Sequence, residues 1–202
     1  MRLNKNSIIF IAIAAGSLNI HPRNVYPDNM KPLAFSLAAQ TQAASLAGQK
    51  KARCFRGMEV LGGWGQANLR YARDYHFLPL IVDFDFDLKR LNPNLRYYFP
   101  GLLELQIEPF FSLVLQPNRN VEIGGIFALK TGLLSESHAF QPYVKVGLGG
   151  IFMTQRAAEQ STQLNFCESA GAGAHYFLDK KTAFTFELRY RHLSNANIKK
   201  PN

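Results

Sequence analysis

The chain has 202 residues, of which 47% are hydrophobic and 12% aromatic, and its formal net charge is +9. That length suits one domain of ordinary size. No apolar run approaches the roughly 18 residues that a membrane-spanning helix needs, which argues against a helical membrane protein. A basic chain can bind nucleic acid, but the Lys and Arg residues are scattered and no nucleic-acid motif is present. We therefore expect no nucleic-acid partner.

The N-terminal residues have the features of a secretory signal. Arg2 and Lys5 precede the short apolar core Ile8–Ala15, and small residues follow it. This pattern predicts a signal peptide over residues 1–17, with a buried helix as the alternative. Residues 18–56 contain three prolines and show no clear period, so we expect an unstructured or processed segment there. A β-barrel is predicted for residues 57–202.

The rest of the chain alternates between apolar and polar residues, which is the pattern of β-strands. In His76–Leu88, for example, the even-numbered residues from Leu78 are apolar, and three aspartates occupy odd-numbered positions. Seven strands are predicted, at residues 58–67, 76–88, 103–115, 121–129, 140–153, 164–178 and 182–193. Cys54 and Cys167 stand in no metal-ligand spacing, and neither do the histidines, so no metal is expected. A disulfide between the two cysteines is an alternative to two free thiols.

The strand lengths and the carboxylates on one face predict an all-β fold, a small antiparallel up-and-down outer-membrane β-barrel. Spanning strands need about 9–11 residues, whereas strands of soluble sheets usually have about 5–6. The mean hydropathy of −0.11 also suits a barrel, because alternating strands average out. A soluble β-sandwich and a soluble lipocalin-like carrier are the alternatives.

The last predicted strand ends in two residues that can carry chemistry. Phe184, Phe186, Leu188 and Tyr190 share one face, and the same parity places His192 and Ser194 on that face. A His and a Ser at the end of an apolar stripe suit chemistry at a lipid boundary. Arg189 and Arg191 have the opposite parity, and we expect them to form ion pairs inside the barrel with Asp83 or Glu104.

The same residues resemble the active-site strand of the outer-membrane lipid A deacylases, the PagL family of acyloxyacyl hydrolases. The resemblance lies in Arg189-Tyr190-Arg191, in His192-Leu193-Ser194-Asn195-Ala196 and in the following Lys199, Pro201 and Asn202, and upstream in Gly171–Leu178. It is convincing from about Phe140 to Asn202. From Gly57 to Gln116 it is a shared barrel pattern.

The resemblance implies a lipid A 3-O-deacylase in the outer membrane of a Gram-negative bacterium. Ser194 would be the nucleophile and His192 the general base, and Asn195 and Asn197 would form the oxyanion hole. The substrate would be lipid A of lipopolysaccharide among outer-membrane lipids, and no cofactor or metal would be needed. The alternative is a non-catalytic barrel that binds lipopolysaccharide or stabilises the membrane.

Members of this family have eight strands, and the final strand carries an acidic residue that orients the histidine. Here the sequence stops at Asn202, soon after the strand with His192, so we expect the eighth strand and the orienting acid to be missing. Glu187 is no substitute, because its parity places it in the barrel interior. An N-terminal segment that closes the gap is the alternative.

Overall fold

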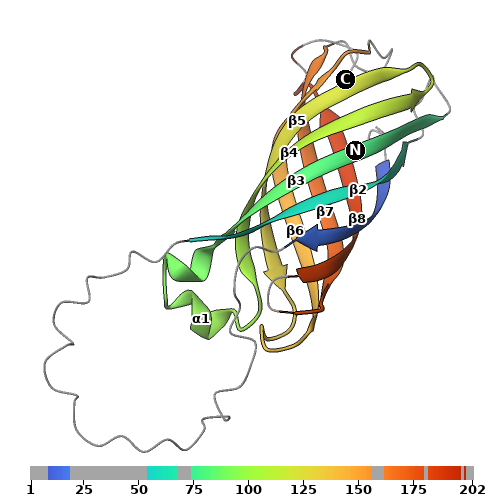
Figure 1. Ribbon diagram of the computed structural model, residues 1–202. Coiled ribbons are helices and arrows are strands. Elements are labelled where there is room, and N and C mark those ends of the chain that lie inside the picture. Colours follow the sequence, from blue (N-terminus) through green and yellow to red (C-terminus); the bar gives the residue numbers. More distant parts are fainter. Residues whose placement is uncertain are drawn as a thin grey trace, which may run out of the picture.

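The computed structural model describes residues 9–18, 54–67, 74–155, 162–179, 182–196 and 198, and within them eight antiparallel strands form a closed barrel (Figure 1). The strands are β1 (Ile9–Leu18), β2 (Phe55–Ala67), β3 (Tyr75–Asp87), β4 (Leu103–Gln116), β5 (Asn120–Gly132), β6 (Phe140–Met153), β7 (Leu164–Phe177) and β8 (Thr182–Ser194). Two short helices, η1 (Leu88–Arg90) and α1 (Leu95–Tyr98), join β3 to β4. The seven predicted strands are confirmed to within a few residues at their ends. In the part of the chain that the structure describes, no helix combines the length and the apolar composition needed to cross a membrane.

The barrel is closed by β1, which lies between β2 and β8 (Figure 1). Ile9 is opposite Ala67 of β2 and Arg191 of β8, and pairing with β8 continues to Leu18 opposite Thr182. Closure by an N-terminal segment is the alternative that the sequence left open. Closure by β1 is important because an open barrel would expose unpaired backbone N–H and C=O groups along two strand edges.

β1 also overlaps the residues in which a signal peptide is predicted, and the removal of that segment stays a prediction. The intact mass of protein extracted from membranes shows whether residues 1–17 are a cleaved signal peptide or remain in the chain as part of the barrel. A mass without residues 1–17 identifies a cleaved signal, and the full-length mass leaves these residues available as β1.

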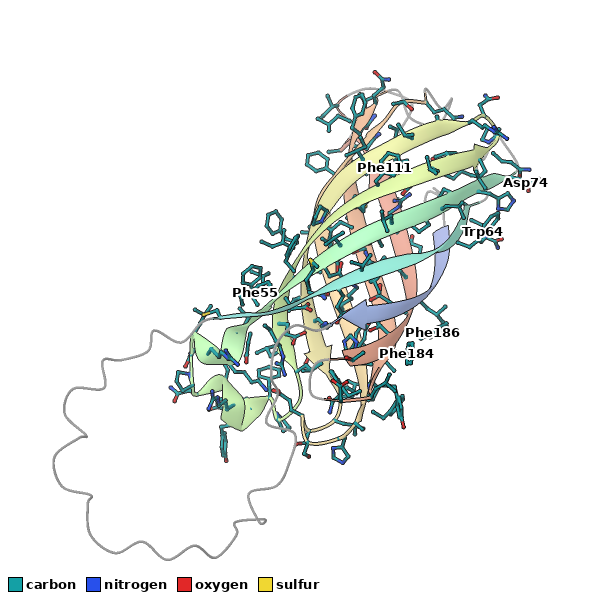
Figure 2. All side chains as sticks on the ribbon, viewed as in Figure 1. Phe55, Trp64, Asp74, Phe111, Phe184 and Phe186 are labelled. Carbon is teal, nitrogen blue, oxygen red and sulfur yellow. The ribbon has the colours of Figure 1, made fainter. Side chains whose placement is uncertain are left out.

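Side chains alternate around the barrel, with apolar groups outside and polar groups inside. In β4, Leu105, Ile107 and Leu113 are exposed, whereas Glu104 and Glu108 are almost fully buried. The exposed apolar groups continue around the wall, where Figure 2 labels Trp64, Phe111, Phe184 and Phe186 among them. The alternation that the sequence shows is therefore an inside–outside division of a closed barrel.

The buried charges of the interior are paired across the barrel. Lys130 Nζ lies 2.9 Å from a carboxylate oxygen of Glu104, and Lys145 Nζ lies 2.6 Å from Glu108 and 2.9 Å from Glu187. Such pairing is needed because an isolated ion in a protein interior is strongly destabilising. The two cysteines are free thiols.

The two arginines of β8 face the interior, as their parity predicts, but their partners differ from those expected. Arg189 lies 2.7 Å from Glu108 and 2.7 Å from Glu187, and Arg191 lies 2.7 Å from Glu122. The expectation of ion pairs with Asp83 or Glu104 did not allow for the stagger of the strands, which decides which charges lie at the same height in the barrel.

One end of the barrel carries a cluster of ion pairs that includes the β5–β6 loop. The carboxylate of Glu136 accepts hydrogen bonds from Arg56 and Lys89, and Arg56 Nε lies 3.0 Å from Glu104. Partial burial disfavours the charged carboxylate of Glu136, but the nearby charge of Arg56 and the two hydrogen bonds outweigh burial and lower its pKa.

This cluster should make the barrel sensitive to acid. Because the pKa of Glu136 is lower in the folded chain, its contribution to stability is complete above the unfolded value of about 4.3 and is lost as pH falls through the folded value. We expect Glu136→Gln to lower the urea midpoint at neutral pH and to reduce its fall on acidification. Asp74→Asn, which changes an exposed carboxylate at the other barrel end, is the control. A Glu136→Gln chain with unchanged acid sensitivity would contradict the assignment.

Close packing at Gly149 in β6 gives a second test of the fold. A Cβ atom there would overlap the carbonyl oxygen of Gly125 and lie 2.8 Å from Cα of Ile126, whereas at Gly150 the nearest atom, Asn165 O, is 3.9 Å away. We expect Gly149→Ala to destabilise the barrel by about 1–3 kcal/mol through overpacking. Gly150→Ala, the matched control, should leave the unfolding midpoint in urea nearly unchanged. Equal midpoints for the two variants would argue against this packing.

Candidate active site

β8 presents His192 and Ser194 on the outer surface of the barrel. Both side chains are half-buried. Leu193, which lies between them, and Arg191, which precedes His192, are buried inside the barrel. The outward stripe continues along the strand through Tyr190, Leu188 and Phe186, which are all exposed. The shared face of the histidine and the serine, predicted from the parity of the strand, is therefore confirmed by the structure.

The spacing of the two residues suits a proton transfer. Residues two apart in a strand have Cα atoms about 6.5–7 Å apart and side chains that point in the same direction. An imidazole can bridge that span to a neighbouring hydroxyl. A His and a Ser in this arrangement can act as general base and nucleophile.

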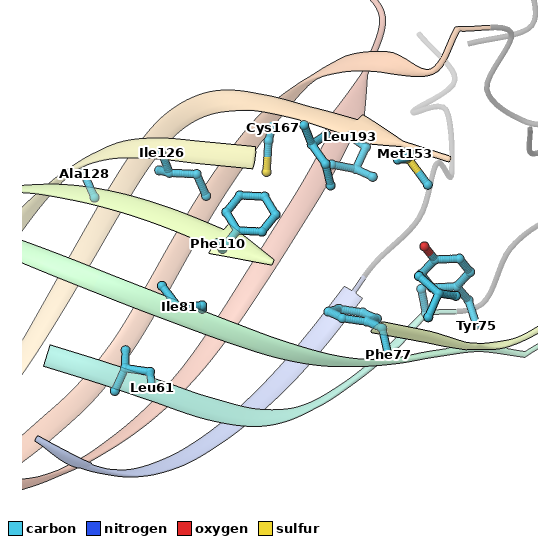
Figure 3. Close-up of a cluster of buried hydrophobic side chains, with 13 residues drawn as sticks. Leu61, Tyr75, Phe77, Ile81, Phe110, Ile126, Ala128, Met153, Cys167 and Leu193 are labelled. Atoms are coloured by element: carbon cyan, nitrogen blue, oxygen red, sulfur yellow. The ribbon is translucent and has the colours of Figure 1, made fainter. Parts of the chain in front are cut away.

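Inward-facing residues hold this part of β8 in place. The guanidinium of Arg191 pairs with Glu122 and lies 4.7 Å from the ring centre of Phe77. Tyr75 donates a hydrogen bond of 2.5 Å to the other carboxylate oxygen of Glu122. Leu193 belongs to a buried apolar cluster inside the barrel that also contains Cys167 (Figure 3). The backbone on both sides of His192 is thus anchored from the interior, which leaves the outer face free for chemistry.

The chain turns sharply after Ser194. The backbone N–H of Ala196 donates a 3.1 Å hydrogen bond to the hydroxyl oxygen of Ser194, and the N–H of Ile198 donates to the carbonyl of Asn195. Ala196 has a φ of 53°, a left-handed conformation that is unfavourable for residues other than glycine. A serine hydroxyl that accepts this bond still has its own proton to donate to a base.

The cross-strand neighbours of the two residues come from β7. Phe166 lies opposite Ser194, and Glu168 lies opposite His192. Phe166 and Glu168 are both exposed on the outer surface. Glu168 is not among the residues predicted for the site, although its alternation with the inward-facing Cys167 and Ser169 indicates an outward position.

The expected oxyanion groups are only partly located. Asn195 is 1% exposed and lies beneath the surface that carries Ser194. Asn197 lies outside the described residues. Glu187 is buried in the interior, where it pairs with Lys145 and Arg189, so its predicted exclusion from the outer surface is confirmed. Within the described ranges, no three His, Cys, Asp or Glu residues are grouped in a way that could hold a metal ion.

The Arg191–Glu122 pair should be important for the stability of this end of the barrel. We expect Glu122→Gln to destabilise the fold by about 3–5 kcal/mol, because it leaves the Arg191 charge buried without its partner. Combining it with Arg191→Met should recover part of the loss, since no buried charge then remains at the pair. Urea unfolding of the purified chain in detergent measures both effects. Fully additive losses in the double variant would show that the two residues do not act as a pair.

A family model described as lipid A 3-O-deacylase (PagL) matches residues 81–202 of the chain. This stretch is more than half of the chain and runs from Ile81 in β3 through β8. The matched stretch begins well before Phe140, so the likeness to the family covers more of the chain than the motifs in the last strands indicate. Comparisons with curated proteins and with solved structures gave no match.

Proposed function

We propose that this chain, which belongs to the lipid A 3-O-deacylase (PagL) family, is an outer-membrane serine esterase that removes the ester-linked 3-hydroxyacyl chain from the 3-position of lipid A. The observation that carries the proposal is the placement of His192 and Ser194 on the exposed apolar wall of a closed barrel. The family match supports a hydrolase that acts on lipid A. The residue roles given below are part of the proposal.

The apolar wall of the barrel supports the membrane location that is part of this proposal, and the family match supports the outer membrane of a Gram-negative bacterium as that membrane. Its exposed surface is lined by aromatic and aliphatic side chains on every strand from β2 to β8 whose side chains the structure describes. Such a surface is unfavourable in water but favourable against acyl chains. A lipid that diffuses in the membrane plane would reach an outward-facing Ser194 directly, without entering the charged interior.

The reaction needs two steps, each with a balanced proton transfer. His192 takes the hydroxyl proton of Ser194 as the oxygen attacks the ester carbonyl, and the same proton then goes to the departing sugar oxygen. This step breaks the ester and leaves an acyl group on Ser194. Water then attacks the acyl-enzyme and gives one proton to His192, which returns it to the Ser194 oxygen. The products are a free 3-hydroxy fatty acid and a lipid A hydroxyl.

Donors for the oxyanion would come from the turn after β8. The backbone of Ser194–Ala196 forms a turn that is closed by the hydrogen bond from the Ala196 N–H to the Ser194 hydroxyl. The left-handed φ of Ala196 is a strained conformation, and strained backbone is often found at active sites. We assign the oxyanion hole to Asn195 and Asn197, as the family resemblance implies. For Asn195 the backbone N–H beside Ser194 is the better candidate, because its side chain is buried.

Substitution of the two central residues tests the proposal. Ser194→Ala and His192→Ala should each lower the rate of lipid A 3-O-deacylation by at least about 10⁴-fold, because nucleophile and base act as a unit. Mass spectrometry of lipid A from cells or detergent extracts measures the product. Both variants should keep the heat-modifiable gel mobility of a folded barrel.

Ser137→Ala and His138→Ala are matched controls, because both residues are exposed in the loop between β5 and β6 at the opposite end. They should retain wild-type turnover. Full deacylation by Ser194→Ala would contradict the assignment of Ser194 as the nucleophile. A wild-type chain that binds lipopolysaccharide without product, and whose Ser194 does not react with a fluorophosphonate probe, would favour the non-catalytic barrel.

A further inference from the structure

Glu168 is an unusual residue for the outer surface of this barrel. At the outward-facing positions of β2 to β8, the side chains that the structure describes are apolar or uncharged, apart from Glu168 and the histidines His76 and His192. Every other Asp or Glu in these strands is buried in the interior. An ionisable residue on a lipid-facing wall is costly, so its presence there points to a function and to a specific partner.

The partner that the strand register assigns to Glu168 is His192. The two residues lie directly opposite each other in the antiparallel β7–β8 pair, and both face outward. Directly opposed residues on one face have Cβ atoms about 4.5–5.5 Å apart, which is closer than neighbours along a strand. A glutamate side chain is long enough to bring a carboxylate oxygen to a ring nitrogen across that gap.

The register that produces this pair is firmly determined. β7 and β8 pair without a shift from Phe166 opposite Ser194 to Phe177 opposite Ala183. Cys167 and Leu193, one residue from Glu168 and His192 respectively, are opposite each other, are buried and belong to the same interior cluster (Figure 3). A slip by one residue would turn these apolar groups outward, so interior packing keeps Glu168 opposite His192.

We propose that Glu168 is the positioning residue for His192. It is the orienting acid, and it comes from β7, the strand before the one that carries His192 and Ser194. This inference rests on the proposed function, because it assigns a task within the same esterase site. One nitrogen of His192 accepts the proton of Ser194, and the N–H of the other nitrogen donates to the carboxylate of Glu168. The carboxylate fixes the tautomer and the ring orientation, and it stabilises the imidazolium that forms during each step.

Other acidic residues of the last strands are unsuited to this role. Glu187 is 0% exposed and accepts hydrogen bonds from Tyr143 and Arg189 inside the barrel. Its side chain is on the opposite side of the wall from His192. The low dielectric of surrounding acyl chains would also strengthen a carboxylate–imidazolium contact on the outer surface relative to one in water.

The test compares Glu168→Gln, Glu168→Asp and the double variant Glu168→Gln/His192→Ala, with Asp74→Asn as the control. Asp74 is an exposed carboxylate before β3, at the same end of the barrel as Ser194 (Figure 2), so its amide variant makes the same chemical change away from the site. Two quantities are measured in detergent: kcat and KM for lipid A deacylation, and the rate at which a fluorophosphonate probe labels Ser194. Heat-modifiable mobility reports folding.

We expect Glu168→Gln to lower kcat by about 10²–10⁴-fold with little change in KM, since losing the orienting acid of a triad costs up to about 10⁴-fold. Glu168→Asp should recover part of that loss, because it keeps the charge. In the His192→Ala background, Glu168→Gln should have no further effect, since a residue that acts through His192 has nothing left to position. Asp74→Asn should behave as wild type.

Each other outcome is decisive. Wild-type kcat in Glu168→Gln, or an additive loss in the double variant, overturns the role of Glu168 and leaves the proposed function intact. Probe labelling that falls with Glu168→Gln in a chain that does not deacylate lipid A supports the role and overturns the substrate. A wild-type chain that shows neither deacylation nor labelling overturns both. Should Glu168→Gln lose heat-modifiable mobility, the folded Glu168→Asp decides the question. A kcat and a labelling rate between those of wild type and His192→Ala support the role, and a kcat and a labelling rate equal to those of wild type overturn it.

Discussion

The alternation of side chains across a closed, antiparallel hydrogen-bonded wall is the constraint on which the rest of this structure depends. Every inward position must be satisfied by an ion pair, a hydrogen bond or apolar packing, and every outward position is left to the surroundings. The interior meets this demand with Lys130, Lys145 and Arg189 set among buried carboxylates. The outer wall is almost wholly apolar, which is why a His, a Ser and a Glu at one end of it stand out.

Both faces of β8 therefore contribute to the site, because the inward residues hold the strand in place and the outward residues carry the proposed chemistry. Arg191 and Leu193 fasten β8 to the interior through Glu122, Phe77 and the apolar cluster. This leaves the intervening His192 and the following Ser194 with little freedom to turn inward. Preorganisation of this kind is what an esterase needs, because the barrier to acyl transfer falls when base and nucleophile are held in position before the substrate arrives. The interior thus serves the proposed chemistry without touching the substrate.

The acid that orients a histidine in a barrel wall can come from either of the two strands that flank it. A strand in a sheet has two flanking strands, and either can present a side chain opposite the histidine. In this chain β1 occupies one side of β8, and β7 occupies the other with Glu168. The resemblance points to an acid on a following strand, whereas the register of β7 offers one on the preceding strand.

The strands, their inward and outward faces and the shared face of His192 and Ser194 could all be predicted from the amino-acid sequence. These follow from a period of two residues, which is a local property that can be read without knowing any neighbour. Tertiary structure alone decided that residues 9–18 close the barrel, that Arg189 pairs with Glu108 rather than Asp83, and that Glu168 lies opposite His192. Those facts depend on register and stagger between strands, which are set by packing and hydrogen bonding across the whole barrel and leave no signal within a single strand.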